Sequence, residues 1–160
     1  MTVVSPDQLK FPHSFQAQVI HIDDGDTFWV HAGGYEFKIR LAYIDAPEKD
    51  QPGGAEATNF LQQLIGGQQV TIVPTGTTLR REDASVYLNG HDVASIMVMS
   101  GYAWDYHQFS KGAYQPLQQL AQNARVGLWK NTNNVSPYAW RVIKKHGYNS
   151  LDPRYLRAEP

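Results

Sequence analysis

Acidic and basic side chains suited to phosphate or metal chemistry gather in one early stretch of the chain. Asp26 follows a tight acidic turn, and Arg40, Asp45 and Glu48 come soon after it. Charged groups are rarely buried unless they are paired or bound to a metal ion. Carboxylates bind Ca²⁺ or Mg²⁺ and can take a proton from water, while a guanidinium binds phosphate oxygens. Composition alone also allows a solvated acidic hairpin, but the order of the residues favours a site.

The elements that must position these residues are three strands joined by two tight turns. Alternating residues predict strands over 15–22, 27–31 and 35–44, with Asp-Gly and Gly-Gly pairs between them. Asp26 begins the second strand and Asp45 ends the third. A strand start and the end of an adjacent antiparallel strand lie side by side, so we expect these side chains to converge at one end of a sheet.

The order of these residues resembles the staphylococcal nuclease (thermonuclease) family. The likeness rests on DGDT at 24–27, RLAYIDAPE at 40–48 and QPGGAEA at 51–57, and it extends over residues 13–141. The resemblance implies a five-stranded barrel of the oligonucleotide-binding (OB) type. It also implies Ca²⁺-dependent hydrolysis of DNA and RNA, with the phosphate left on the 3′ side.

The resemblance assigns a role to each charged residue. Asp26, Asp45 and the Ala46 carbonyl would hold Ca²⁺, Glu48 would activate water, and Arg40 would bind the phosphate. The alternatives are structural: Asp26 would fix the turn, Asp45 would cap a strand, and Glu48 would be an ordinary surface residue.

The second arginine of the family pattern has two candidates in this sequence. The family's Asp-x-Tyr-Gly-Arg is replaced here by residues 77–81, which contain neither the aspartate nor the glycine. Counting back from the turn at Gly90 places Arg81 on the family's arginine, and Arg80 is the alternative. We predict a polar loop over 75–83, and its departure from the family pattern puts the efficiency of catalysis in question.

Aromatic residues follow between positions 102 and 109. Aromatic rings stack on bases without strong sequence demands. We expect Tyr106 to contact the substrate, and Tyr87 is a second candidate. Tyr102 and Trp104 belong to the same aromatic cluster, and the alternative to base contact for them is packing over the barrel and the helices. Trp129 and Trp140 are expected to fix the third helix and the tail.

The rest of the pattern completes an α+β fold. Helices are predicted over 53–67, 92–100 and 113–124, and two further strands over 69–73 and 84–88. Five strands and three helices in this order fit a small OB-type barrel. We divide the chain into a flexible arm (1–12), a nuclease-like domain (13–141) and a C-terminal extension (142–160).

The composition limits which classes of protein and of metal site are possible. The length of 160 residues suits one domain, and no apolar run approaches a membrane span. Cysteine is absent, and the six histidines lack metal-ligand spacing. The first 100 residues carry a net charge of −6 and the last 60 carry +5. No signal peptide is visible, so secretion or the periplasm would require one to have been removed, and the compartment stays open.

Two rivals to a nuclease follow from the same residues. A barrel without catalysis would bind nucleic acid or protein, and a purely structural domain would use the acidic cluster as a turn. For the nuclease we expect a monomer that acts on nucleic acid, with single-stranded DNA and RNA as the preferred partners, and no membrane association.

Overall fold

Five strands close into a barrel in the computed structural model, which describes residues 2–3, 13–78 and 81–146. The barrel strands are β2 (Phe15–Ile22), β3 (Thr27–Ala32), β4 (Tyr35–Leu41), β6 (Gln69–Thr78) and β7 (Arg81–Leu88). They follow the order β4-β3-β2-β6-β7, and β7 pairs with β4 in parallel to complete the ring. The short strands β1 (Thr2–Val3) and β8 (His91–Asp92) pair with β4 and β7, respectively. The predicted α+β OB-type barrel is confirmed.

The barrel interior is filled by alternating residues of its strands. Phe28 and Val30 of β3 and Phe37, Ile39 and Leu41 of β4 are almost completely buried. In a strand, residues two apart share a face, so the residues between these point outward. The same alternation in β4 turns Arg40 away from the interior, toward the end of the barrel where β3 begins.

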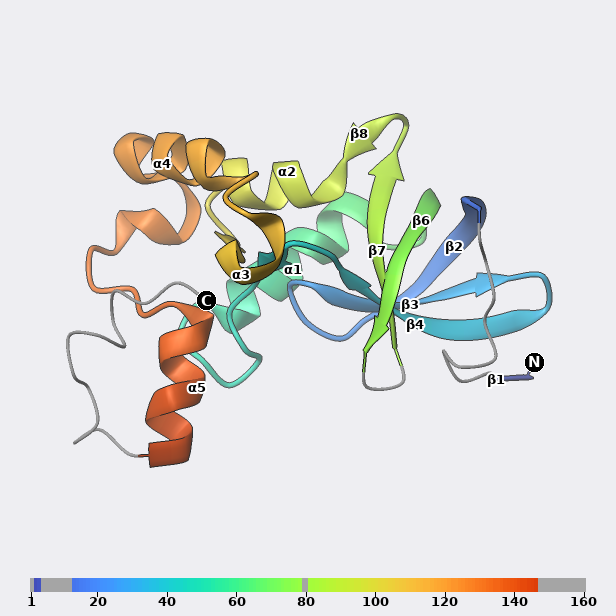
Figure 1. The fold of residues 1–160 in the computed structure, drawn as a ribbon, viewed down its shortest axis with the longest axis horizontal. Coiled ribbons are helices and arrows are strands. Elements are labelled where there is room, and N and C mark those ends of the chain that lie inside the picture. Colours follow the sequence, from blue (N-terminus) through green and yellow to red (C-terminus); the bar gives the residue numbers. More distant parts are fainter. Residues whose placement is uncertain (1, 4–12, 79–80, 147–160) are drawn as a thin grey trace.

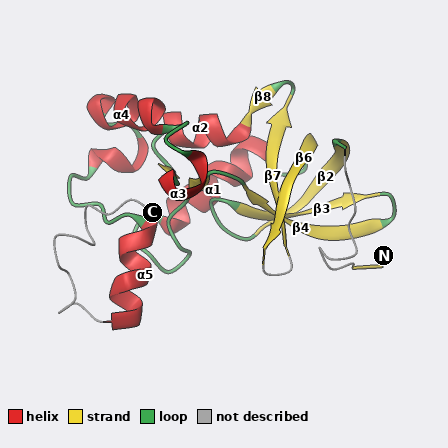
Figure 2. Cartoon of the chain, in the orientation of Figure 1, coloured by secondary structure: helices red, strands yellow, loops and turns green. Residues whose placement is uncertain are grey.

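The helices lie together at one side of the barrel (Figures 1 and 2). They are α1 (Gly54–Ile65), α2 (Val93–Met99), α3 (His107–Ser110), α4 (Gln115–Ala124), the 3₁₀ helix Gly127–Lys130 and α5 (Pro137–His146). The three predicted helices correspond to α1, α2 and α4. In the part of the chain that the structure describes, no helix has the length and apolar character needed to cross a membrane.

Helix α5 was not predicted, because its segment is rich in Asn, Tyr and Pro. Its first residue is Pro137, and proline fits the first helical turn, where its missing N–H costs nothing. Ala139 and Ile143 face inward and are buried. The helix runs across residue 141, where we expected the domain to end. The predicted arm and extension lie mostly outside the described residues.

The predicted polar loop over 75–83 is wrong, because the two strands that flank it are longer than expected. β6 and β7 stay paired as far as Thr78 and Arg81, with a register shift between Pro74 and Gly76. Proline cannot donate to a ladder, and a bulge lets the strand continue past it. Pro74 therefore does not end the strand, and Arg81 begins β7.

Gly25, in the acidic turn, packs too closely against its neighbours to leave room for a side chain. A Cβ at this position would lie 2.8 Å from the Cβ atoms of both Ala46 and Ala57. We expect Gly25→Ala to lower the free energy of unfolding by about 1–3 kcal/mol, as overpacking does. Gly76→Ala is the matched control, since a Cβ there meets no atom within 4 Å. Equal stability of the two variants in urea unfolding would show that this close contact is unimportant.

Candidate active site

The site begins where β3 starts and β4 ends. Thr27 pairs with Arg40 across these strands, and the Leu41 N–H donates to the Asp26 carbonyl oxygen at 2.8 Å. The strand start and the strand end therefore lie side by side, as the alternation predicts. This register brings the Asp26 carboxylate and the Arg40 guanidinium together.

A second pairing adds Asp45 to the same place. Strand β5 (Ile44–Asp45) runs antiparallel to β9 (Trp104–Asp105), far along the chain. The turn before β5 contains Tyr43, whose φ of 72° is unusual for a residue with a side chain. The Tyr43 carbonyl accepts a hydrogen bond from the Tyr106 N–H at 2.9 Å. The turn thus ties Tyr106 to the segment that carries Asp45.

Arg40 lies between the two carboxylates. Its Nη2 atom is 3.6 Å from Asp26 Oδ2 and 3.5 Å from Asp45 Oδ1, and all three side chains are largely buried. Burial lowers the pKa of Arg40, but Asp26 and Asp45 outweigh it, so the pKa lies above its ordinary value. The guanidinium is held in its charged form beside both acids.

Asp26 is kept ionised by its surroundings. Burial acts to raise its pKa, but Arg40 and the hydrogen bonds that the carboxylate accepts bring the pKa below its ordinary value. Thr27 Oγ1 donates to Oδ1 and the Ala46 N–H donates to Oδ2, both at 2.9 Å. Both carboxylate oxygens are therefore oriented by neighbours.

Two acids that lie beside Asp26 and Arg40 have raised pKa values. Burial and the nearby Asp26 charge raise the pKa of Asp24 to about 8. Burial raises the pKa of Asp45 to about 6, although a hydrogen bond from Arg141 opposes the shift. Crowded carboxylates in a partly buried site disfavour each other's ionised forms.

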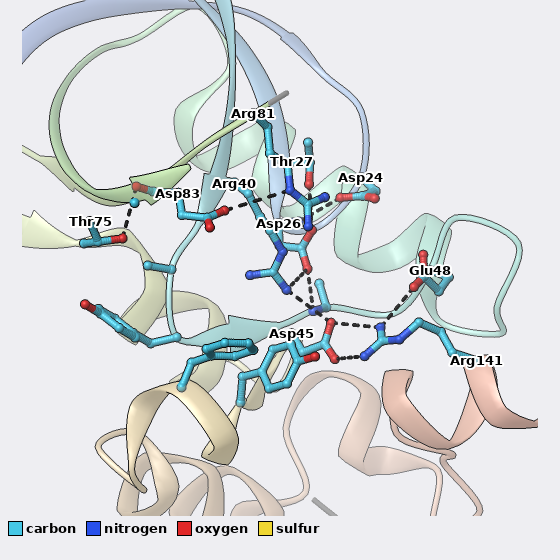
Figure 3. Close-up of a pocket in the computed structure, with 16 residues that line it drawn as sticks. Asp24, Asp26, Thr27, Arg40, Asp45, Glu48, Thr75, Arg81, Asp83 and Arg141 are labelled. Carbon is cyan, nitrogen blue, oxygen red and sulfur yellow. Dashed lines mark hydrogen bonds and ion pairs between the residues drawn. The ribbon is translucent and has the colours of Figure 1, made fainter. Parts of the chain in front are cut away.

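These residues line a pocket of about 420 Å³ (Figure 3). Its acidic lining residues are Asp24, Asp26, Asp45, Glu48 and Asp83, its basic ones are Arg40, Arg81 and Arg141, and its aromatic ones are Tyr43, Tyr106 and Phe109. The predicted residues Asp26, Arg40, Asp45, Ala46, Glu48, Arg81 and Tyr106 all belong to this lining. Seven of the 16 residues that line the pocket were thus candidates from the sequence alone.

The aromatic residues divide between the pocket and the core. The Tyr106 ring centroid lies 5.6 Å from the Arg40 guanidinium carbon and packs edge-on against Phe109. Tyr102 stacks on Phe60, as its structural alternative predicted. Tyr87 does not line the pocket. It lies six residues along β7 from Arg81, or roughly 20 Å at the usual strand rise.

Arg81 reaches the pocket from the start of β7. Its Nε atom lies 3.9 Å from Asp83 Oδ1, and both side chains are partly buried. Residues two apart in a strand share a face, which is why both point to the pocket. Arg80, the alternative, lies outside the described residues.

Arg141 is the site residue that sequence reasoning missed. It enters from α5 and donates to Asp45 at 2.7 and 3.2 Å and to Glu48 at 3.0 Å. The contact joins residues 96 positions apart in the chain, so no local periodicity indicates it.

The acidic side chains that line the pocket do not form a three-ligand metal cluster among the described residues. Over residues 2–3, 13–78 and 81–146, no three His, Cys, Asp or Glu side chains are grouped to hold a metal ion. Asp26 and Asp45 nevertheless approach the same Arg40 nitrogen. Two carboxylates that share one cation present hard oxygen donors, and Ca²⁺ or Mg²⁺ fills its remaining positions with carbonyl oxygens and water.

The fold is an OB-type barrel, and its pocket combines carboxylates, guanidiniums and aromatic rings. These groups together suit a protein that acts on phosphate groups. The sequence model of the family described as "Staphylococcal nuclease homologue" matches residues 38–131. The chain belongs to this family.

Several curated proteins are similar over most of the chain. An "Uncharacterized endonuclease" of Haemophilus influenzae is 36% identical over 131 residues, which cover 80% of this chain and 74% of that protein. A "Micrococcal nuclease" of Shigella flexneri is 32% identical over 148 residues, covering 84% and 85%. "Staphylococcal-like nuclease CAN1" of Arabidopsis thaliana is 35% identical over 114 residues, covering 70% of this chain and 35% of that longer protein.

The raised pKa of Asp24 predicts how stability changes with pH in EDTA. The folded protein keeps a proton on Asp24 up to about pH 8, whereas the unfolded chain releases it near 3.8. The free energy of unfolding therefore falls as pH rises between these values. We expect Asp24→Asn to flatten this fall and to raise Tm at pH 8 by at least about 3 °C. Parallel pH profiles of the two proteins would contradict the account of this acid.

Proposed function

We propose that the protein is a Ca²⁺-dependent endonuclease that hydrolyses phosphodiester bonds of DNA and RNA and leaves 3′-phosphates. The observation that carries the proposal is the convergence of Asp26, Arg40, Asp45 and Glu48 in one pocket. Membership of the staphylococcal nuclease homologue family and the nuclease names of its relatives support an endonuclease-like function.

The donor set of the pocket fits a hard divalent cation. Asp26, Asp45 and the Ala46 carbonyl oxygen would hold Ca²⁺, which accepts carboxylates, carbonyl oxygens and water together. Burial and crowding raise the pKa values of Asp24 and Asp45, and a cation bound beside these acids would favour their ionised forms. When bound, Ca²⁺ supplies positive charge that polarises the scissile phosphate.

Glu48 is the proposed general base. It takes a proton from a water molecule, whose oxygen then attacks phosphorus as the bond from phosphorus to the 5′ oxygen breaks. The 5′ oxygen leaves and takes up a proton from solvent, while the phosphate stays on the 3′ side. The Glu48 side chain is about one-third exposed, so water can reach it.

Arg40 and Arg81 are the proposed phosphate ligands. The oxygens around phosphorus gain negative charge in the transition state, and forked guanidiniums stabilise that charge with paired hydrogen bonds. Arg40 is buried and fixed between carboxylates, so its side chain loses little conformational entropy when substrate binds. Arg81 must turn from Asp83, its neighbour on the strand, toward the phosphate.

The substrate surface is proposed from the pocket lining. Tyr106 would stack on a base beside the scissile phosphate, since its ring already lies next to two guanidiniums. Unpaired bases can reach such a ring, which favours single-stranded DNA and RNA. We propose that the protein acts as a monomer, because one chain contributes every residue of this machinery.

Replacement of Glu48 tests the proposed base. We expect Glu48→Gln to lower single-turnover cleavage of single-stranded DNA in Ca²⁺ by at least about 100-fold, because the amide cannot accept the proton. Glu56→Gln is the matched control, since Glu56 is exposed on α1 and away from the pocket. EDTA should abolish cleavage by the wild type. Unchanged cleavage by Glu48→Gln would remove this mechanism, and binding of DNA without cleavage by the wild type would favour a non-catalytic barrel.

Paired alanine variants decide between the two arginines. We expect Arg81→Ala to reduce kcat by about 10²–10³-fold with a smaller change in KM, because the lost bonds form with developing charge. Arg80→Ala should cleave at close to the wild-type rate. The reverse order of the two effects would assign the phosphate to Arg80 instead.

A further inference from the structure

The Arg141 guanidinium occupies the place where the proposed metal ligand and the proposed base meet. Its Nη2 atom donates to Asp45 Oδ2 at 2.7 Å, and its Nη1 atom donates to Asp45 Oδ1 at 3.2 Å and to Glu48 Oε1 at 3.0 Å. Both oxygens of Asp45 are therefore engaged by one side chain. Figure 3 shows Arg141 reaching in from α5 to lie between the two acids.

Helix α5 is attached to the segment that carries Glu48. Lys144 Nζ lies 2.6 Å from Asp50 Oδ2, and the Trp140 indole N–H donates to Asp50 Oδ1 at 3.4 Å. Just before the helix, the Val135 carbonyl accepts from Gln51 Nε2 at 2.6 Å. These contacts on both sides of Arg141 fix the helix and aim the guanidinium into the pocket.

The bonds of Arg141 leave Asp45 little capacity for another cation. A carboxylate offers about four lone-pair positions, and Asp45 already accepts from Arg141 twice and from Arg40 at 3.5 Å. The positive charge of Arg141 also repels an approaching metal ion, strongly so in a partly buried site. One oxygen of Glu48 accepts from the same guanidinium, which restricts how this carboxylate can orient water.

We propose that Arg141 is an internal counter-ion that competes with the divalent cation for Asp45, and that it must release Asp45 and Glu48 before the site can work. This inference rests on the proposed function. It makes α5 a latch: the arginine closes the site without metal, and metal binding opens it. Ion pairing at Asp45 and metal affinity are then linked, and each weakens the other.

A role limited to holding the helix predicts something different. Lys144 also joins α5 to the barrel side, through Asp50, but its side chain is half exposed and lies outside the pocket lining. If Arg141 served only to hold α5, its removal would weaken the helix and leave metal affinity unchanged or lower. Competition predicts the opposite sign, because removal of Arg141 frees both Asp45 oxygens.

Calorimetric titration of Ca²⁺ without nucleic acid measures that sign. We expect Arg141→Gln to lower the Kd for Ca²⁺ by at least about fivefold relative to the wild type. Lys144→Ala is the matched control, since it removes one positive charge from the same helix and should change the Kd by less than about twofold. Equal or weaker Ca²⁺ binding by folded Arg141→Gln would overturn the latch.

A second variant protects the test against loss of folding. Arg141→Lys keeps the charge but lacks the fork that bridges two carboxylates, so its Kd should fall between those of the wild type and Arg141→Gln. Thermal unfolding in EDTA shows which variants are folded. Wild type that binds Ca²⁺ with the same Kd as both variants removes the latch and leaves the proposed function intact. Absence of Ca²⁺ binding by the wild type and by both variants overturns both.

Discussion

The shared contact of Asp26 and Asp45 with Arg40 is the interaction on which the site depends. Two carboxylates brought together in a largely buried pocket repel each other and need a cation between them. The guanidinium supplies one, at 3.6 and 3.5 Å. Closure of the barrel by β4 and β7, and the pairing of β5 with β9, hold these three residues in place although they come from different strands.

The uneven charge of the chain acquires a physical meaning in this arrangement. The acidic first part and the basic last part pair with each other at α5, where Arg141 binds Asp45 and Glu48 and Lys144 binds Asp50. These two basic residues are therefore already paired with acids of the same chain. The pocket therefore holds its own positive charge before any substrate or metal arrives, and a ligand must exchange partners with it.

The sequence was most informative where local geometry sets the contact. Alternation and the acidic turn predict that Asp26 and Arg40 lie side by side, because register follows from tight turns and from the two-residue period. Arg141 could not be predicted in this way, because its contacts span 96 residues and depend on a helix within an Asn- and Pro-rich segment. The strand end predicted at Pro74 was wrong, because a bulge accommodates the proline and the strand continues. Tyr87 was predicted to contact the substrate because it is aromatic, and the prediction did not include its distance from Arg81 along β7.

A crystal of the protein soaked with Mn²⁺ or Ca²⁺, with anomalous diffraction to locate the ion, would show directly whether the pocket binds a divalent cation. We expect one cation in the pocket, within about 2.0–2.6 Å of carboxylate oxygens of both Asp26 and Asp45, with the Arg141 guanidinium moved away from Asp45. An ion bound elsewhere, or a saturated crystal in which Arg141 still bridges Asp45 and Glu48 with no ion beside them, would contradict this expectation.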